Sequence, residues 1–292
     1  MNAKSIVLGT AGLGGVWGKV DRSAAVRTLL TALENGIAAI DTAPAYGDAE
    51  EIVSDALKQW KGPVPVISTK AGRLRSYAAD EAYYDYSAAG IMNSVYRSLK
   101  TLGVPVLDIL FLHDPEAVPE QEGDQVVAVM LHLKQQGLVK KIGLGGNIPL
   151  WMEAYIKTGV FDVIMEFNRL NACSTAALKD RLPFCNTRGM AYYAASPLYM
   201  GLLGRNFQAW QQQPPQWLPA GSIATAQRLQ LIAAKHHLPL PVLAHRFLLT
   251  VPRAFSIVIG ASCVTELEES LSAFRQGPLP EAIYQEILDC NK

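Results

Sequence analysis

Three short apolar runs near the start of the chain lead into side chains that can hold or move a proton. Asp41 and Tyr46 lie in IDTAPAYG, Lys70 lies in ISTKAGR, and His113 lies in LFLHDPE. A phenol has a reference pKa of about 10, so acid–base work by Tyr46 near neutral pH requires a cation that stabilises tyrosinate. Lys70 can be that cation if Asp41 keeps it protonated, and a neutral His113 can orient a substrate oxygen. Together they suit hydride transfer at a carbonyl or alcohol carbon.

The same stretches contain side chains that could bind a metal ion. Asp41, His113, Asp114 and Glu116 offer oxygen and nitrogen ligands. We nevertheless expect no metal, because Lys70 would repel a cation and no second histidine lies nearby in the sequence. Each proton-handling residue alone also has an ordinary structural role, such as a helix cap or a turn. Their occurrence at the ends of successive strands favours catalysis.

Nucleophilic catalysis is not indicated elsewhere in the chain. Ser196 lacks the flanking glycines of a nucleophile elbow, and nothing beside Cys173 or Cys185 would activate a thiol. The four cysteines are widely spaced, without the CxxC pairs of a metal site or the density of a disulfide framework. We therefore expect reduced, structural thiols.

The elements that must position these residues alternate between strand and helix. Apolar residues recur at helical spacing after a cap at Asp21 or Ser23, and again after a cap at Ser87. Eight apolar strands in alternation with helices predict an α/β fold, a (β/α)8 TIM barrel in one domain of residues 1–292. The strands are expected near 6–8, 37–41, 64–69, 107–112, 140–144, 161–167, 190–195 and 256–259. The main helices are expected after Asp21 or Ser23, near 49–60, 87–102, 123–136, 149–158 and 174–182, and through Leu267 and Leu271.

Long loops and extra helices add to the barrel. Residues 71–86 contain Arg73, Arg75 and several tyrosines without a period, which predicts a loop over the C-terminal mouth of the barrel that binds substrate. Residues 201–222 are rich in proline and glutamine and predict a second such loop. Extra helices are expected near 223–237, 240–249 and 280–290.

Glycines follow the first strand in the run GTAGLGGVWG. A dinucleotide fingerprint of the GxGxxG type would place a third glycine at position 17, where the chain has Trp17. We therefore interpret this run as a flexible connection between the first strand and the first helix.

Composition limits the classes of partner. The chain has 292 residues, with 26 Lys and Arg against 26 Asp and Glu, so no net field attracts nucleic acid or an anionic membrane. It contains no apolar run of about 18 residues and no clear signal peptide. We expect a cytoplasmic protein, a monomer or small homo-oligomer, that acts on a small sugar or aldehyde.

Taken in order, the motifs around Asp41, Tyr46, Lys70 and His113 resemble the catalytic tetrad of the aldo-keto reductases, a family of nicotinamide-dependent barrel enzymes. The resemblance spans nearly the whole chain. It implies that Gly145 and Asn147 hold the carboxamide of the cofactor and that Ser196 and Leu198 lie on its pyrophosphate side. The segment 259–270 resembles the part that binds the adenosine phosphate, which implies contacts from Gly260, Ser262, Glu266 and Ser270.

Two departures from the family bear on the cofactor. Ala195 stands before Ser-Pro-Leu, where the family often has a tyrosine that stacks on nicotinamide. Where many members have basic residues that bind the extra phosphate of NADP, this chain has Gly260, Ser262 and Glu266, with Glu268 and Glu269 close by. A carboxylate repels that phosphate and can accept hydrogen bonds from free ribose hydroxyls. We expect NAD, with NADP as the alternative.

The resemblance also implies a substrate class. IVLGTAGLGG and SPLYMGLL are similar to the branch that oxidises aldoses such as L-fucose or D-arabinose at C1, which also contains pyridoxal dehydrogenases. We therefore expect an NAD-dependent enzyme that oxidises an aldose to its lactone. The alternatives are an NADPH-dependent carbonyl or aldehyde reductase, a pyridoxal dehydrogenase, and a non-catalytic subunit that binds nicotinamide.

Overall fold

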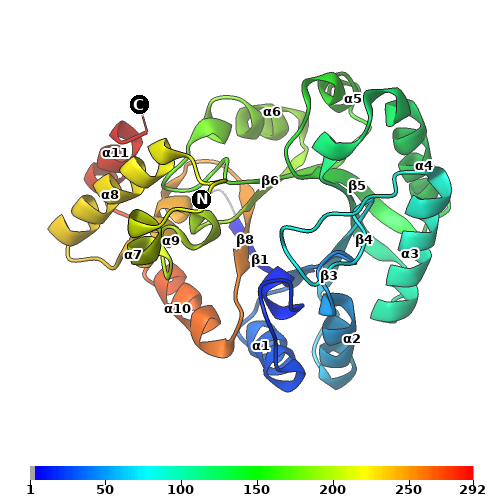
Figure 1. Cartoon of the computed structure of the whole chain (residues 1–292), viewed down its shortest axis with the longest axis horizontal. Helices are drawn as coiled ribbons and strands as arrows, with labels where there is room; N and C mark the ends of the chain where they lie inside the picture. Colours follow the sequence, from blue (N-terminus) through cyan, green and yellow to red (C-terminus); the bar gives the residue numbers. More distant parts are fainter. Residues whose placement is uncertain (1–3, 292) are drawn as a thin grey trace. The chain divides into compact units, whose positions relative to one another are not determined.

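A computed structural model describes residues 4–291. Its eight strands follow one another in chain order around a closed barrel, which confirms the predicted (β/α)8 fold (Figure 1). Each ladder whose register is described is parallel. The strands are β1 (Lys4–Gly9), β2 (Ala39–Asp41), β3 (Val66–Ala71), β4 (Leu107–His113), β5 (Val139–Gly145), β6 (Val163–Phe167), β7 (Ala191–Ala195) and β8 (Phe255–Gly260).

The chain divides into two compact units. The first unit contains residues 6–165 and 260–267, and the second contains residues 166–259 and 268–291 together with the first described residues. The predicted single domain stays a prediction. All four residues of the expected tetrad belong to the first unit.

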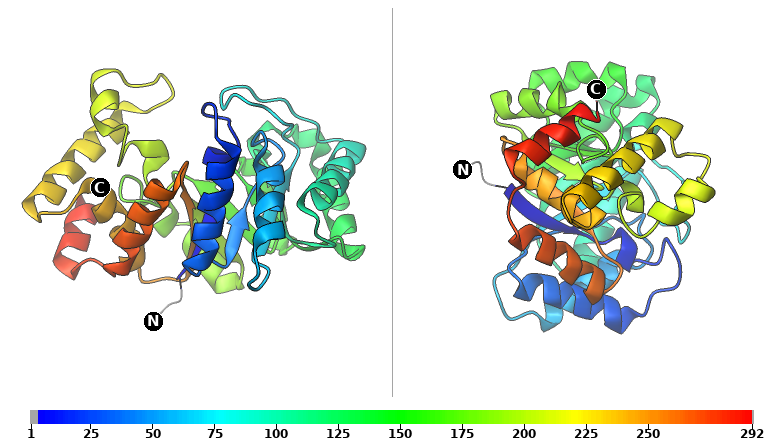
Figure 2. Two further views of the ribbon diagram at one scale, coloured as in Figure 1. Left: turned by 90° about the horizontal axis from the view of Figure 1, so that it is seen from below. Right: turned by 90° about the vertical axis from the view of Figure 1, so that its left-hand side faces the viewer.

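In the first unit, helices cover the outer side of the strands. Asp21 accepts a hydrogen bond from the backbone N–H of Ala24 at 2.8 Å, so Asp21 rather than Ser23 caps the first helix. Ser87 caps a later helix as predicted, because its hydroxyl accepts the N–H of Gly90 at 3.0 Å. Successive helices pack side by side in Figures 1 and 2. They are α1 (Arg22–Glu34), α2 (Ala49–Gln59), α3 (Ala88–Leu102), α4 (Gly123–Gln135) and the short α5 (Glu153–Thr158).

The second unit differs in places from the sequence prediction. Instead of one helix over 174–182, a 3-10 turn at Ala176–Leu178 precedes α6 (Arg181–Arg188). The carboxylate of Asp180 accepts the N–H of Arg181 and so starts a new helix there. The expected loop 201–222 contains a further helix, α7 (Phe207–Gln212). The remaining helices are α8 (Ala220–Lys235), α9 (Leu240–Thr250) and α11 (Glu281–Asp289), which contact one another, and α10 (Val264–Arg275).

Burial follows the expected apolar pattern. In strand β4 the three consecutive apolar residues from Leu110 to Leu112 are fully buried, as is typical of a strand covered on both faces. No helix within residues 4–291 is long and apolar enough to cross a membrane.

Candidate active site

The four residues of the expected tetrad lie at the same ends of three neighbouring strands. Asp41 ends β2, Lys70 is the residue before the end of β3, and His113 ends β4. Tyr46 follows β2 in the loop that leads to α2. Because parallel strands bring their carboxyl ends to one side of a barrel, these residues meet at its C-terminal mouth.

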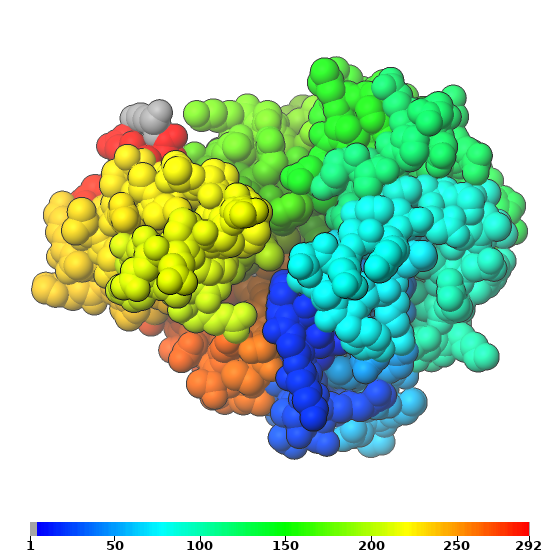
Figure 3. All heavy atoms as spheres, in the orientation of Figure 1, coloured from blue at the N-terminus to red at the C-terminus, as the bar shows by residue number. Residues whose placement is uncertain are grey.

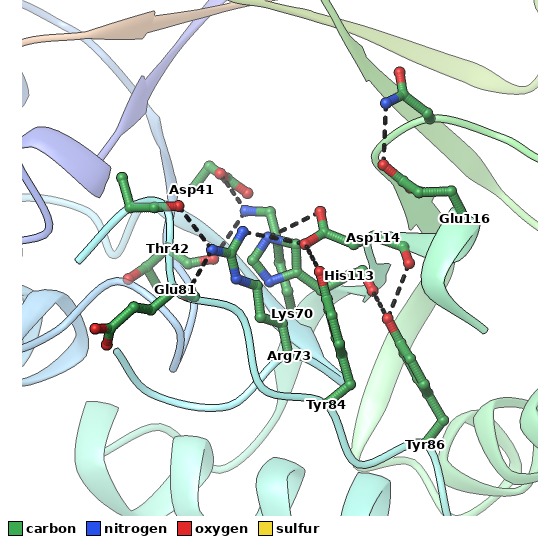
Figure 4. A network of polar contacts seen from close by, with 12 residues as sticks. Asp41, Thr42, Lys70, Arg73, Glu81, Tyr84, Tyr86, His113, Asp114 and Glu116 are labelled. Atoms are coloured by element: carbon green, nitrogen blue, oxygen red, sulfur yellow. Dashed lines mark hydrogen bonds and ion pairs between the residues drawn. The ribbon is translucent and has the colours of Figure 1, made fainter. Parts of the chain in front are cut away.

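Lys70 and Asp41 form a buried ion pair (Figure 4). The ammonium donates to Asp41 Oδ2 at 2.5 Å and to the carbonyl oxygen of Thr42 at 3.0 Å. The hydroxyl of Ser68 donates to Asp41 Oδ1 at 2.8 Å, so both carboxylate oxygens are hydrogen-bonded. Burial lowers the pKa of Lys70, whereas Asp41 and Tyr46 raise it. The pKa of Lys70 lies above its ordinary value as a result. Lys70 therefore stays charged.

Two glycines fix the backbone that carries Tyr46. A Cβ on Gly14 would lie 1.7 Å from the carbonyl oxygen of Tyr46, and a Cβ on Gly47 would lie 2.1 Å from that of Gly14. The N–H of Asp48 donates to Gly14 at 2.9 Å across this contact. The glycine run after β1 is thus no loose connection at Gly14, because it packs directly against the loop that positions the phenol.

The phenol of Tyr46 lies beside the ammonium. Lys70 Nζ is 4.9 Å from the centre of the Tyr46 ring, and the ring of His113 meets it edge-on at 5.6 Å. We expected Lys70 to lower the pKa of this phenol. Burial raises the pKa of Tyr46 by more than the charge of Lys70 lowers it, and Asp41 adds to the increase, so the net direction is upward. In the chain alone, Tyr46 is therefore a protonated acid.

His113 is neutral, as the sequence predicted. Burial lowers its pKa well below the usual value, and the positive charges of Lys70 and Arg73 lower it further. Its side chain is buried, and Nδ1 has no hydrogen-bond partner among residues 4–291. The hydroxyl of Tyr86 donates to its backbone carbonyl at 2.8 Å. The ring is held by its backbone and remains able to bond a substrate oxygen.

The predicted loop over the mouth is present, but its two arginines have different partners. Arg73 Nη1 donates to Asp114 at 3.1 Å, whereas Arg75 turns to α2 and pairs with Glu51. Arg75 is therefore not available to a substrate in the described arrangement. In Figure 3 the loop, coloured cyan, lies beside the dark blue glycine run, and the N–H of Ala79 donates to Val16 at 3.1 Å.

The buried carboxyl group of Glu50 lies beside Thr69, the residue that precedes Lys70. The side chain of Thr69 donates to Glu50 Oε1 at 2.7 Å, and both residues are buried. Burial raises the pKa of Glu50, and the hydrogen bond from Thr69 only partly opposes it. Since the folded pKa lies above the ordinary value of 4.5, the stability that Glu50 contributes is full below about pH 4.5 and is lost as pH rises through the folded pKa.

Glu50→Gln should therefore change the pH dependence of stability. The amide keeps an acceptor for Thr69 and cannot ionise, so we expect the variant to be more stable than wild type at pH 8 by on the order of 1 kcal/mol. At pH 4.5 the two should be alike. Urea unfolding at both pH values measures the difference. If wild type and Glu50→Gln lost the same stability between pH 4.5 and pH 8, the raised pKa assigned to Glu50 would be wrong.

Two of the residues expected to hold the carboxamide are in the first unit. Gly145 ends β5 beside His113, and its carbonyl accepts the N–H of Asp114 at 3.0 Å. The exposed side chain of Asn147 donates to Glu116 Oε1 at 3.0 Å. An amide carries both a donor and an acceptor, which fits the carboxamide of nicotinamide.

The segment expected to bind the adenosine phosphate, residues 259–270, includes Gly260 at the end of β8. A Cβ there would meet no atom within 4 Å, so the end of β8 has open space in front of it. Glu266 Oε2 accepts both the N–H and the hydroxyl of Ser262, each at 2.8 Å. Gly12 approaches the same segment, because its Cβ would lie 3.1 Å from the carbonyl oxygen of Ala261. The segment thus combines open space at Gly260 with a carboxylate that is fixed by Ser262.

The other expected cofactor residues belong to the second unit. Ser196 has a left-handed backbone with φ of 62°, and its carbonyl accepts the amide of Asn171 at 3.2 Å. Leu198 accepts the N–H groups of Gly201 and Leu203 through its carbonyl. Ser270 is buried on α10. Their cofactor contacts stay predictions.

The alternative metal site gains no support. Within residues 4–291, no three His, Cys, Asp or Glu side chains are grouped so as to hold a metal ion. The charged Lys70 beside Asp41 explains why this part of the mouth is unsuited to a cation.

Sequence reasoning did not find the role of three residues of the site, although it named Asp114 as a possible metal ligand. Asp114 carries its carboxylate between His113 and Arg73, Tyr86 holds the backbone of His113, and Gly14 supports Tyr46. The position of Asp114 directly after a strand-end histidine was the available signal for the first. Nothing in the local sequence pairs Gly14 with Tyr46.

The comparison with families decides the assignment. A model described as the aldo/keto reductase family matches residues 5–292. The chain belongs to the aldo/keto reductase family. This confirms the resemblance carried by the four motifs and makes the chain an oxidoreductase of that family.

Relatives in the aldo/keto reductase family include sugar and pyridoxal dehydrogenases. L-galactose dehydrogenase of Arabidopsis thaliana is 30% identical over 284 residues, covering 94% of this chain and 85% of the relative. Pyridoxal 4-dehydrogenase of Microbacterium luteolum is 27% identical, with coverage of 94% and 91%. D-threo-aldose 1-dehydrogenase of a Pseudomonas species is 26% identical, with coverage of 96% and 92%. Among solved structures, an aldo-keto reductase from Bacillus halodurans in its holo form shares the fold, with a TM-score of 0.79, 23% identity and coverage of 99% and 92%.

Proposed function

We propose that this chain is an NAD-dependent dehydrogenase that oxidises an aldose at C1 to the lactone. The observation that carries the proposal is the arrangement of Tyr46 beside the buried Lys70–Asp41 pair and the neutral His113. The similarity to L-galactose dehydrogenase and D-threo-aldose 1-dehydrogenase supports the substrate class.

In this mechanism the chain handles one proton while the cofactor accepts a hydride from C1 when bound. Tyr46 takes the proton of the C1 hydroxyl, and Lys70 stabilises the tyrosinate that does so. His113 holds the same oxygen through a ring nitrogen without adding charge. Aldose and NAD are converted to lactone, NADH and one proton. In the reverse direction Tyr46 gives the proton to the carbonyl oxygen.

The preference for NAD is supported by the segment from Gly260 to Glu266. It contains no lysine or arginine, and its one carboxylate is held at the start of α10 by Ser262. A 2′-phosphate placed there would meet negative charge instead of a basic partner. Asn147 would hold the carboxamide.

A panel of substrates tests the proposal. With NAD, we expect aldoses such as L-galactose, L-fucose and D-arabinose to give the largest kcat/KM, measured through the absorbance of NADH. Pyridoxal with NAD and simple aldehydes with NADPH represent the alternatives. The carboxylate should disfavour NADPH by at least about fivefold in dissociation constant, measured by quenching of tryptophan fluorescence. Turnover of simple aldehydes with NADPH alone, and silence with every aldose, would contradict the proposal.

A further inference from the structure

We propose that Asp114 is a further substrate-binding residue that selects hydroxylated substrates, because its Oδ1 is placed to accept a hydrogen bond from a hydroxyl next to the reacting carbon. The inference rests on the proposed function and refines it. Figure 4 shows Asp114 beside His113, with Arg73 and Tyr84 at its carboxylate.

The backbone of Asp114 is fixed in an unusual conformation. It is left-handed, with φ of 49° and ψ of 62°, directly after His113. Its N–H donates to Gly145 at 3.0 Å, and its carbonyl accepts the hydroxyl of Tyr86 at 2.9 Å. A left-handed residue other than glycine costs on the order of 1 kcal/mol or more and persists where its surroundings hold it. The carboxylate therefore has a defined direction.

Among residues 4–291, only one of the two carboxylate oxygens of Asp114 accepts a hydrogen bond. Oδ2 accepts hydrogen bonds from Arg73 Nη1 and from the hydroxyl of Tyr84, both at 3.1 Å. Oδ1 lies 3.8 Å from His113 Nε2, which is beyond hydrogen-bond distance, and has no closer donor among residues 4–291. The side chain is 17% exposed, so a ligand can reach it. Oδ1 is thus an acceptor in need of a donor.

The partners of Oδ2 hold the carboxylate in place. Arg73 balances its charge and also donates through Nη2 to the carbonyls of Ala79 and Glu81, which ties the loop over the mouth to Asp114. Burial and the charge of Asp114 raise the pKa of Tyr84 to about 12, so this phenol keeps its proton and keeps donating. A rigidly held acceptor loses little entropy when it binds a ligand.

The position of Oδ1 suits a particular ligand. His113 Nε2 and Asp114 Oδ1 are 3.8 Å apart. A substrate whose reacting oxygen is held by Nε2 would therefore bring a hydroxyl on the neighbouring carbon close to Oδ1. A hydroxyl can donate to a carboxylate, whereas a hydrocarbon cannot and would leave Oδ1 without water or partner. Hydrogen bonds to charged groups contribute enough to discriminate by about ten- to a hundredfold. Asp114 therefore favours hydroxylated over plain aldehydes and alcohols.

Two aldehydes of three carbons, D-glyceraldehyde and propanal, isolate this contact, because they differ only in hydroxyl groups. With NADH, Asp114→Asn should lower kcat/KM for D-glyceraldehyde by about ten- to a hundredfold, mainly through KM, and leave propanal within about twofold. Asparagine tolerates the left-handed backbone, so the variant should fold. Glu34→Gln, at an exposed carboxylate of α1, is the control for charge and should change neither substrate.

Binding provides a second measurement that needs no turnover. Titration of L-galactose into NAD-loaded Tyr46→Phe and into Tyr46→Phe/Asp114→Asn should show weaker binding by the double variant, again by about tenfold or more. Equal losses with both aldehydes would mean that Asp114 acts through His113, and no loss in either measurement would mean that it binds nothing. Both outcomes overturn the inference. Because the aldehydes need no aldose oxidation, silence in the aldose panel would reject the proposed function separately.

Discussion

Tyr46→Phe should lower turnover by about 10²- to 10⁴-fold and leave cofactor affinity within about twofold of wild type, because it removes a proton-transfer group and nothing else. The ring contact with His113 does not involve the hydroxyl, and the backbone bonds to Ala43 and Ala49 are retained. Steady-state kinetics with the best substrate and titration of NADH by fluorescence measure the two quantities. Tyr77→Phe, which alters an exposed phenol that donates to Asp48, is the matched control.

The pH dependence gives the same prediction a second test. Burial raises the pKa of Tyr46 more than Lys70 lowers it. Oxidation requires the deprotonated phenol, so wild-type oxidation should increase with pH on the alkaline side, and reduction should decrease there. The residual rate of the Phe variant should lack this titration. Unchanged turnover in the Phe variant would mean that Tyr46 is not the proton-transfer group, whereas a wild type without turnover would favour a barrel that binds nicotinamide without catalysis.

The sequence was sufficient for the barrel and for the strand-end positions of the expected tetrad, whose catalytic roles stay predictions. Asp41, Lys70 and His113 each end a short apolar run, and parallel strands necessarily bring such residues to one side. The apolar alternation placed every strand within a few residues of its observed range. The short apolar runs and the polar residues that end them were enough here, because neighbouring residues in the sequence determine where a strand lies and where it ends.

Other features depended on contacts between distant segments. A glycine run signals a close approach, but only the fold shows that Gly14 meets Tyr46. Arg75 was predicted to contact substrate because it lies in the loop over the mouth, but it pairs with Glu51 of α2 instead. The direction of the pKa shift of Tyr46 is a balance between burial and charge, and the sequence reveals the charges but not the burial.

The largest effect on stability is expected at Lys70. Lys70→Met should destabilise the fold by about 3–5 kcal/mol and abolish turnover, because it leaves the charge of Asp41 buried without its cation. Asp41→Asn alone should also destabilise, since it leaves the ammonium without a counter-ion. Urea unfolding near neutral pH measures each loss. Lys58→Met, at an exposed ion pair with Asp55, should cost less than about 1 kcal/mol.

The double variant Lys70→Met/Asp41→Asn separates stability from catalysis. With both charges removed no buried ion remains, so most of the lost stability should return while turnover stays absent. The raised pKa of Lys70 also predicts how stability depends on pH. Stability from this group is full below its ordinary pKa of 10.5 and is lost as pH rises through the higher folded value, so wild type should weaken in strong alkali more steeply than the double variant. Recovery of turnover in the double variant would mean that the phenol needs no cation, and the role assigned to Lys70 would be wrong.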